Sequence, residues 1–438
     1  MSMRLPLAVL LAAAGAVAAP ASAGVIGLNR SADSITATRI VALPTSERRA
    51  WATYYGKSQV QESDDRAALA AELKPGQLAP PKPEGAHGGQ GDGMPLDRDA
   101  AWYGSGAARH VADVIVSFQT PAGGWSKNQN RAGALRLPGQ PYASDNNSRR
   151  LSEDDFDEAS DPDWGYVGTL DNGATITELR FLGKVVARTP NAAGKPYRRA
   201  VERGVRYLLN AQMPNGGWPQ VWPLQGGYHD AVTFNDNAVS GAAALLTEVS
   251  GAGGDFAFLP TAVRAEAGRA AARARACILA AQIRVDGKLT AWGQQADPFT
   301  LEPVAGRNYE PPALASGESA DLLLYLMSLP QPTPAEVAAV HAGVAWLKGV
   351  ALRDKAWVGG KGDPRGRRLV DQPGAPPIWS RYYGVADQRP VFGERDKTLH
   401  DDANELSLER RNGYAWFSTD PQKAIDAHAG WAKAHPAP

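Results

Sequence analysis

Phe118-Gln-Thr-Pro-Ala-Gly-Gly-Trp125-Ser-Lys127 and Ala211-Gln-Met-Pro-Asn-Gly-Gly-Trp218-Pro-Gln220 are two copies of one pattern, Gln-x-Pro-x-Gly-Gly-Trp. Each copy follows an apolar segment with helical periodicity. Proline ends the helix, the glycines allow positive φ, and the tryptophan can fill the next layer. The prolines stand 93 positions apart (214 − 121), which exceeds ordinary solenoid periods, so we expect each copy to span two helix pairs. The repeat therefore predicts an all-α fold of helical hairpins, an α/α toroid.

The composition is that of an ordinary globular protein. The 438 residues are 43% hydrophobic and 21% charged, with 46 basic and 46 acidic side chains. This balance argues against nucleic acid or an acidic membrane as a partner, so an acidic ligand must be met by a local cluster of Arg and Lys. The single cysteine, Cys277, lies in a helical stretch and is expected to be a buried, inert thiol.

The N-terminus has the organisation of a signal peptide. Arg4 precedes an apolar run that is too short to anchor the chain in a bilayer, and Ala21-Ser-Ala23 follows as a cleavage site. We therefore expect residues 1–23 to be removed, and the protein to be exported to the periplasm or the extracellular space.

The remaining chain divides into two parts. Residues 24–97 combine an amphipathic helical segment at 47–73 with a Pro- and Gly-rich linker at 74–97. Residues 98–438 form the helical toroid, in which strand-like alternation is scarce. The expected helices are 100–118, 174–188, 197–212, 237–249, 261–283, 318–328 and 334–348. Long loops separate them, at 121–173, 213–236, 284–317 and 353–402, and we expect these loops to form a cleft suited to an extended polymer.

Two Asp/Asn clusters lie just before expected helices. They are Asp171-Asn172 and Asn235-Asp236-Asn237. Either cluster could simply cap a helix by accepting hydrogen bonds from free backbone amides. Carboxylate and amide oxygens from two loops are also the ligands that Ca²⁺ prefers. Since the two clusters occur at comparable points of the repeat, we favour a calcium site.

Several loops carry arginines that could bind carboxylates. Arg307-Asn-Tyr-Glu310 could form an ion pair that only ties the loop down, or it could belong to a reactive site. Arg381 and Arg395 lie in the C-terminal loops, and guanidinium groups bind planar carboxylates through two hydrogen bonds. Together with the oxygen clusters, they indicate a site for a polyanionic sugar and a cation.

Six motifs occur in a fixed order, and together they resemble polysaccharide lyase family 10, pectate lyases with an irregular (α/α)3 toroid. The resemblance covers roughly residues 100–417. The motifs are Gly-Gly-Trp-Ser-Lys-Asn, Thr-Leu-Asp-Asn-Gly-Ala-Thr-Ile-Thr-Glu-Leu-Arg, Pro-Asn-Gly-Gly-Trp-Pro-Gln, Gly-Gly-Tyr-His-Asp-Ala-Val-Thr-Phe-Asn-Asp, Arg-Asn-Tyr-Glu-Pro-Pro and Glu-Arg-Arg-Asn-Gly-Tyr-Ala-Trp.

The resemblance implies a secreted enzyme that cleaves polygalacturonate by Ca²⁺-assisted β-elimination and leaves 4,5-unsaturated ends. It implies that Asp171 and Asp236 hold Ca²⁺ and that Arg307 is the base. The implied substrate-binding residues are Lys127, Asn172, Asn235, Arg381 and Arg395. We expect a monomer.

Two positions depart from the family pattern. Ser126 stands where the family has proline after the Gly-Gly-Trp, which is a mild change in loop stiffness. Gly306 stands where a bulkier residue usually precedes the arginine, which we expect to loosen that loop.

Three other functions compete with a lyase. A toroid glycoside hydrolase would use a carboxylate pair, either Asp171 with Asp236 or Glu178 with Glu310. A non-catalytic protein would bind oligogalacturonate without turnover. A terpene cyclase fits poorly, since the sequence has no Asp-x-Asp-Asp motif.

Overall fold

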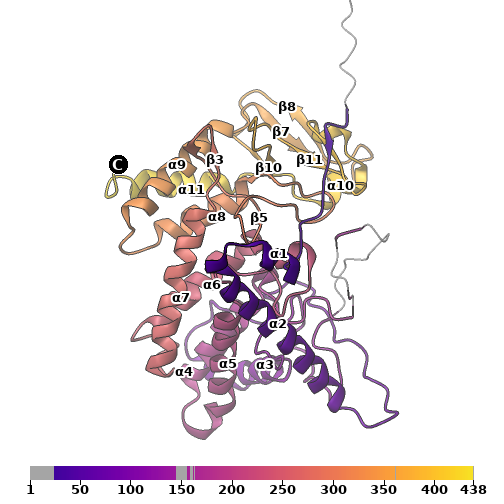
Figure 1. Cartoon of the computed structure of the whole chain (residues 1–438), viewed down its shortest axis with the longest axis vertical. Helices are drawn as coiled ribbons and strands as arrows, with labels where there is room; N and C mark the ends of the chain where they lie inside the picture. The colour runs from indigo at the N-terminus through magenta and orange to yellow at the C-terminus, as the bar shows by residue number, and fades with distance from the viewer. Residues whose placement is uncertain (1–23, 145–154, 158–160, 162, 361, 438) are drawn as a thin grey trace, which may run out of the picture.

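The computed structural model describes residues 24–144, 155–157, 161, 163–360 and 362–437. The expected signal peptide, residues 1–23, lies outside these residues. In the described part, three helical hairpins follow one another along the chain (Figure 1). They are α4 (Ile176–Arg188) with α5 (Lys195–Ala211), α6 (Ala238–Ser250) with α7 (Thr261–Ala280), and α8 (Ser316–Met327) with α9 (Pro334–Val350).

The hairpins pack in two rows. The first helices, α4, α6 and α8, contact one another in that order, and so do the second helices, α5, α7 and α9. The preceding helix, α3 (Gly106–Ser117), packs against the first hairpin, and α11 (Pro421–Trp431) packs against the last. The predominantly helical fold is confirmed, and the arrangement is compatible with the expected toroid. Every helix expected from the sequence between 98 and 348 is present, with shifts of a few residues at its ends.

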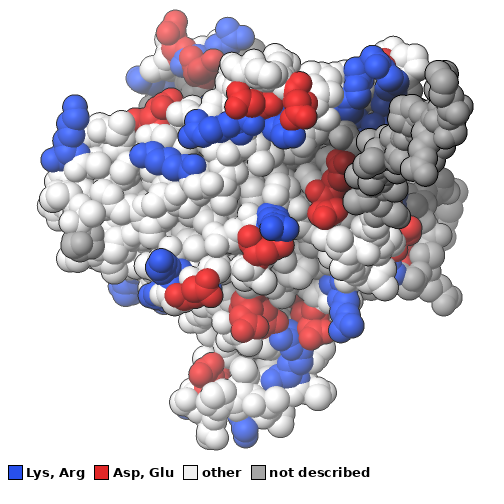
Figure 2. Space-filling view, turned by 90° about the horizontal axis from the view of Figure 1, so that it is seen from above, with Lys and Arg blue, Asp and Glu red and all other residues white. Residues whose placement is uncertain are grey.

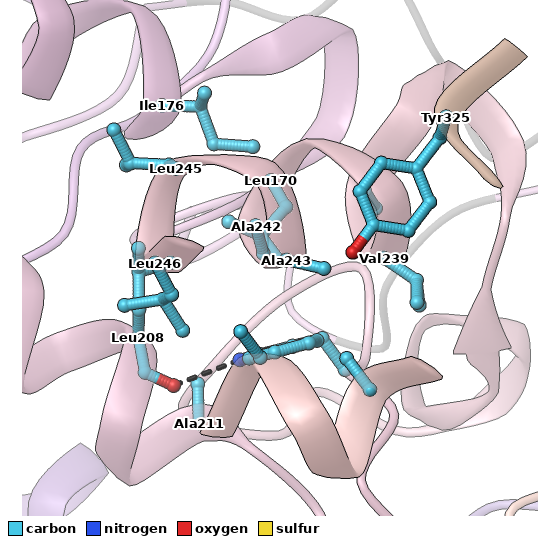
Figure 3. Packing of buried hydrophobic residues seen from close by; sticks show 14 of the residues in the cluster. Leu170, Ile176, Leu208, Ala211, Val239, Ala242, Ala243, Leu245, Leu246 and Tyr325 are labelled. Atoms are coloured by element: carbon cyan, nitrogen blue, oxygen red, sulfur yellow. Dashed lines mark hydrogen bonds between the residues drawn. The ribbon is translucent and has the colours of Figure 1, made fainter. Parts of the chain in front are cut away.

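Apolar spacing explains how the hairpins bury their faces. In α5, Val201, Val205 and Leu208 recur at steps of four and three residues, and all three are fully buried. Helix α6 is apolar on nearly every side because it lies at the centre, between α4 and α8 and against α7; Figure 3 shows its buried side chains. Cys277 of α7 is buried, as expected, and burial raises the pKa of its thiol to about 12, which disfavours the reactive thiolate.

The repeated motif Gln-x-Pro-x-Gly-Gly-Trp forms a turn at the C-terminal end of a helix, which we call the tryptophan turn. Trp218 is buried, and its Nε1 donates to the Leu208 carbonyl at 2.8 Å, the hydrogen bond drawn in Figure 3. The Gln212 side-chain amide donates to the Gly216 carbonyl and to Ala270 of the next hairpin. Trp125 and Gln119 make the same contacts one hairpin earlier. Each turn therefore joins neighbouring hairpins.

A third copy follows α7, which the sequence pattern did not reveal. Gln282 donates to the Thr290 and Ala339 carbonyls, and Trp292 Nε1 donates to Ile278. A small hairpin of β3 (Arg284–Val285) and β4 (Lys288–Leu289) lies between them and breaks the spacing. The expectation that each copy spans two helix pairs is wrong. One pair separates successive copies, and the long loop 121–173 accounts for the extra length between the first two.

The described strands are short, at most four residues each, and most lie in the C-terminal part of the chain. The pairs there are β6 (Leu314–Ala315) with β10 (Tyr382–Tyr383), β7 (Lys355–Val358) with β8 (Arg368–Asp371), and β9 (Trp379–Ser380) with β13 (Phe417–Ser418). Tyr309, Tyr382 and Tyr414 belong to a second, smaller core beneath these strands, separate from the core of the helical body. This second core supports the arginine loops.

The N-terminal residues run along the outside of the hairpins. Helix α2 (Thr45–Ala71) coincides with the expected helical segment but is only weakly amphipathic, and Tyr54 within it donates to the Ala211 carbonyl at 3.1 Å. Helix α1 (Ala37–Ala42) precedes it. Further upstream, β1 (Gly27–Leu28) joins a three-stranded sheet with β12 (Thr398–His400) and β11 (Phe392–Gly393). The beginning of the described chain thus reaches the C-terminal part (Figure 1).

Candidate active site

Two short turns bring the Asp/Asn clusters together. The 3-10 turn η2 (Asp171–Gly173) contacts η5 (Asn235–Asn237), and the Asn172 amide lies 3.4 Å from Asp236 Oδ2. Asn172 and Asp236 both have left-handed φ angles, 54° and 50°. The side chains do not cap α4 or α6, because neither helix has a side-chain hydrogen bond at its N-cap. The capping interpretation is therefore wrong, and strained backbone of this kind is typical of functional sites.

Asp171 is paired with the expected lysine. Lys127 Nζ donates to Asp171 Oδ2 and lies 3.6 Å from the ring centroid of Tyr166. Burial alone would raise the pKa of Asp171, but Lys127 holds it well below its usual range. Burial alone would lower the pKa of Lys127, and Asp171 raises it. The ion pair therefore favours the carboxylate form of Asp171 and the ammonium form of Lys127.

Asp236 continues the site towards Arg381. Asn235 Nδ2 donates to Asp236 Oδ2 at 2.9 Å, and Arg381 Nη2 donates to Asn235 Oδ1 at 3.0 Å. Arg381 also forms an ion pair with Glu318, in which Nη2 lies 2.8 Å from Oε1. Loss of hydration, and then the nearby Asp171 carboxylate, raise the pKa of Asp236. Two carboxyl groups that repel in this way favour the binding of a cation between them.

Arg307 is gripped by Glu310. Its Nε and Nη2 donate to Glu310 Oε1 at 3.0 and 2.6 Å, so the ion pair considered from the sequence is present. The guanidinium also lies over the rings of Tyr309 and Tyr414. Burial alone would lower the pKa of Arg307, but Glu310 raises it well above the ordinary value. Arg381 also lies over the Tyr414 ring, so the two arginines share one aromatic neighbour.

Arg395 lies at the edge of the cluster. It forms a two-point ion pair with Glu409, with both distances 3.0 Å, and its Nη1 lies 3.3 Å from Asp157. It shares the Tyr309 ring with Arg307, at 5.5 Å from the centroid. The structure therefore brings Lys127, Asp171, Asn172, Asn235, Asp236, Arg307 and Arg381 together, and places Arg395 one layer further out.

The two departures from the family pattern have structural explanations. Ser126 is buried and donates to Gln129 and to the Tyr142 carbonyl, where a proline side chain could not donate a hydrogen bond. A Cβ on Gly306 would lie 2.4 Å from Glu310 Oε2. Gly306 therefore makes room for the carboxylate that holds Arg307, and the expectation that it loosens the loop stays a prediction.

A cleft of about 970 Å³ opens beside the two turns. Asn172 and Asp236 form its inner wall, with the first turns of α4 and α6, and Asn128 contributes a further amide. The opposite wall comes from residues 84–90, within the segment expected to be a linker. Gln90 fixes that wall by donating to Glu178 at 2.8 Å and accepting from the Asn128 amide. The long loops alone do not build the cleft.

Several side chains that contact the candidate site residues could not be identified from the sequence. His229, which lies within the fourth of the six motifs, contacts the Tyr166 hydroxyl at 3.1 Å. Burial lowers its pKa to about 3, so it is neutral. Tyr166 itself, Glu318 and Tyr414 were not identified. Tyr414 lies within the last of the six motifs, which was the available signal, whereas nothing in the sequence marks Tyr166 or Glu318.

The oxygen donors suit a hard cation. The described residues contain no group of three His, Cys, Asp or Glu side chains that could hold a metal ion, so Asp171 and Asp236 would need further ligands from elsewhere. A carboxylated substrate and water supply such oxygens. The residues present therefore fit a cation that is bound jointly with an acidic substrate.

The face of the molecule seen in Figure 2 has no dominant sign of charge. Figure 2 shows acidic and basic side chains interspersed over one face of the molecule, with broad uncharged areas between them. Within the described part of the chain, no helix combines the length and apolarity needed to cross a membrane. The arginine cluster, rather than a global field, is what the structure offers to an acidic ligand.

Comparisons with known proteins agree with this chemistry. A family model described as pectic acid lyase matches residues 119–425. A family 10 polysaccharide lyase from Cellvibrio cellulosa is similar in structure, with 30% identity and a TM-score of 0.63, covering 77% of this chain and 97% of that one. A mutant of the Cellvibrio cellulosa family 10 polysaccharide lyase in complex with trigalacturonic acid has 30% identity and a TM-score of 0.62, covering 78% and 98%. The comparison with curated proteins found no match.

Proposed function

We propose that this protein cleaves polygalacturonate by Ca²⁺-assisted β-elimination. The premise is that the chain belongs to the pectic acid lyase family and is a pectate lyase. The observation that carries the proposal is the contact between the turns of Asp171 and Asp236, with Arg381 joined to Asp236 through Asn235. Arg307 shares the Tyr414 ring with Arg381, and Asp236 lines the cleft. The solved relative bound to trigalacturonic acid supports an oligogalacturonate as the ligand.

The residues divide the chemistry between them. Asp171 and Asp236 would hold Ca²⁺, which when bound neutralises the uronate carboxylate and makes the C5 proton more acidic. Arg381, and at greater distance Arg395, would donate hydrogen bonds to substrate carboxylates. Lys127, Asn172 and Asn235 would orient the sugar through their amide and ammonium groups. The two Asp carboxylates are fixed before binding, which lowers the cost of ordering the site.

Arg307 is proposed as the base. The C5–H electron pair forms the C4=C5 double bond, the C4–O4 bond breaks with its electrons on O4, and the proton from C5 goes to the guanidine. The leaving O4 then takes a proton from water. This requires neutral Arg307, and Glu310 opposes that form by raising the pKa of Arg307. We therefore expect an alkaline optimum, since the neutral fraction grows as pH rises.

Two observations disfavour a hydrolase. The carboxylates of a glycoside hydrolase flank the bond to be cleaved and stand at least about 5 Å apart. Asp171 and Asp236 instead meet across two touching turns. Glu178 is fully buried and bonded to Arg131 and Gln90, so it has no access to a substrate. The remaining alternative is a protein that binds oligogalacturonate without cleaving it. In such a protein, substitution of Arg307 would abolish no catalytic activity.

We also propose the finer features that the sequence implied. The three hairpins would close into an irregular (α/α)3 toroid, which the contacts along both helix rows support. Residues 1–23 would direct export to the periplasm or the extracellular space, and the protein would act as a monomer.

The test is incubation with polygalacturonate and Ca²⁺ at alkaline pH, with near-ultraviolet absorbance as the readout and EDTA as the control. A Ca²⁺-dependent rise in absorbance reports the unsaturated ends of elimination. New reducing ends without absorbance would mean hydrolysis and would overturn the role of Arg307. The absence of both signals would indicate a protein that binds the polysaccharide without cleaving it.

A further inference from the structure

We propose that Asn29 is a positioning residue that holds the Arg307 loop in its reactive geometry. Asn29 belongs to the N-terminal segment, far upstream of the residues that match the family model, 119–425. The inference rests on the proposed role of Arg307 as the base, and it adds a residue from outside the matched domain to the machinery of elimination.

The Asn29 side chain converges on the backbone of the Arg307 loop. Its Nδ2 donates to the carbonyls of Arg307, Asn308 and Glu310 at 3.1, 2.9 and 3.1 Å. An amide has two N–H groups, so one of them is shared between two acceptors. Asn29 Oδ1 accepts from the Arg30 amide at 3.0 Å, which fixes the orientation of the group. Asn29 is 4% exposed, so water does not replace these hydrogen bonds.

The segment around Asn29 is tied down by strand pairing. Ile26 and Asn29 donate backbone hydrogen bonds to the carbonyls of Leu399 and Lys397, both at 2.8 Å, on either side of β1. Figure 1 shows this segment running from α1 to the part of the molecule that holds β11. The Asn29 amide is therefore carried on a strand and reaches the Arg307 loop from outside the helical hairpins.

The loop needs a donor at this place. Residues 306–310 form a tight turn in which Glu310 N donates to the Arg307 carbonyl at 2.8 Å and Gly306 N donates to the Glu310 carbonyl at 3.0 Å. The turn gathers three carbonyl oxygens around one point, where they repel one another unless a donor lies between them. Since Arg307 and Glu310 are both on this turn, its shape sets the direction of the guanidinium. A misplacement of about 1 Å at a catalytic group can cost about 100-fold in rate.

The test compares Asn29→Asp with the wild type as the full exported enzyme. The substitution keeps size and shape but replaces the donor with an oxygen that repels the three carbonyls. We expect kcat to fall at least ~10-fold while KM for polygalacturonate and the Ca²⁺ requirement stay within ~2-fold. Asn29→Ser, which keeps one donor, should lie between the two. If Asn29→Asp does not fold, as judged by circular dichroism, Asn29→Ser carries the test.

A matched control separates positioning from stability. Thr36→Ala, in the same segment, removes the side-chain hydrogen bond to the Arg39 amide at the start of α1. It should lower the melting temperature without lowering kcat. An Asn29 variant that lowers the melting temperature no more than Thr36→Ala, yet loses kcat, supports the inference. Unchanged kcat in Asn29→Asp and Asn29→Ser would overturn it.

A double-mutant cycle connects the effect to Arg307. If Asn29 acts through Arg307, Asn29→Asp should cost little further rate in an Arg307→Lys background. An undiminished loss in that background would overturn the positioning role while leaving the proposed base intact. If Arg307→Lys alone keeps the wild-type rate, the proposed base itself is wrong, and that result is independent of Asn29.

Discussion

Glu310 holds Arg307 through one carboxylate oxygen, Oε1, which accepts from Nε at 3.0 Å and from Nη2 at 2.6 Å. Tyr414 donates to the same oxygen, and the Arg307 amide donates to the other. Burial alone would raise the pKa of Glu310, but Arg307 lowers it to about 2, so Glu310 is ionised at every working pH. The base of the proposed reaction is therefore paired with a permanent negative charge.

This pairing predicts a shifted pH profile in Glu310→Gln. The carboxylate raises the pKa of Arg307, so its removal lowers that pKa. Activity should rise as pH increases through the pKa of a base that reacts in its neutral form. The rising limb of kcat/KM should therefore move to lower pH, by about 1 to 3 units. Glu409→Gln, which removes the partner of Arg395 instead, is the control, and a limb that stays in place would contradict an Arg307 base.

The Asp171 carboxylate should set the Ca²⁺ requirement. In Asp171→Asn, the half-maximal Ca²⁺ concentration should rise more than ~10-fold, because a neutral amide is a weaker ligand for a hard cation. The kcat/KM value at low Ca²⁺ should fall at least ~100-fold. A Ca²⁺ titration of the absorbance rate measures both quantities. Asp113→Asn, which changes the hydrogen bond from Tyr197 outside the site, should leave the titration unchanged.

Asp65 should make stability depend on pH. It is fully buried in α2, where burial raises its pKa to about 6 from an ordinary 3.8. Its contribution is present below about pH 3.8 and is lost as pH rises through about 6, when the buried group must ionise. Asp65→Asn should therefore gain about 2 to 3 kcal/mol relative to wild type between pH 4 and 8.

Urea unfolding at the two pH values measures this gain. Asp64 is the exposed neighbour of Asp65 on the same helix, and Asp64→Asn is the control for the loss of an exposed carboxylate. A difference between Asp65→Asn and wild type that does not change with pH would contradict the raised pKa of Asp65.

The three tryptophan turns should be energetically equivalent. Trp218→Phe and Trp292→Phe each remove an indole N–H from a buried helix-end carbonyl and leave a small void, so each should cost about 2 to 4 kcal/mol in unfolding free energy. Equal costs, within about 1 kcal/mol, would confirm that the third copy belongs to the repeat. Trp357→Phe breaks no hydrogen bond within the described part of the chain and should cost less. A negligible loss for Trp292→Phe alone would contradict the equivalence.

The helices could be predicted from the sequence because their signals are local. Apolar residues at steps of three and four, and the Pro-Gly-Gly-Trp turns, act within one or two turns of chain, and the observed bounds follow them closely. The third turn escaped because β3 and β4 lengthen it by a small hairpin. The spacing between the first two turns was misread because sequence distance does not distinguish a long loop from a second helix pair.

The candidate site, like the fold, could be predicted only in part from the sequence. The sequence by itself determined which residues are the candidates for the chemistry: Asp171 and Asp236 stand in oxygen-rich turns before helices, and the arginines stand in motifs of fixed order. Only the tertiary structure decided that the two turns touch and that Asn29 reaches the Arg307 loop. These contacts join residues from separate elements, and the distance between such residues is fixed by helix packing and strand pairing rather than by local preferences of the chain.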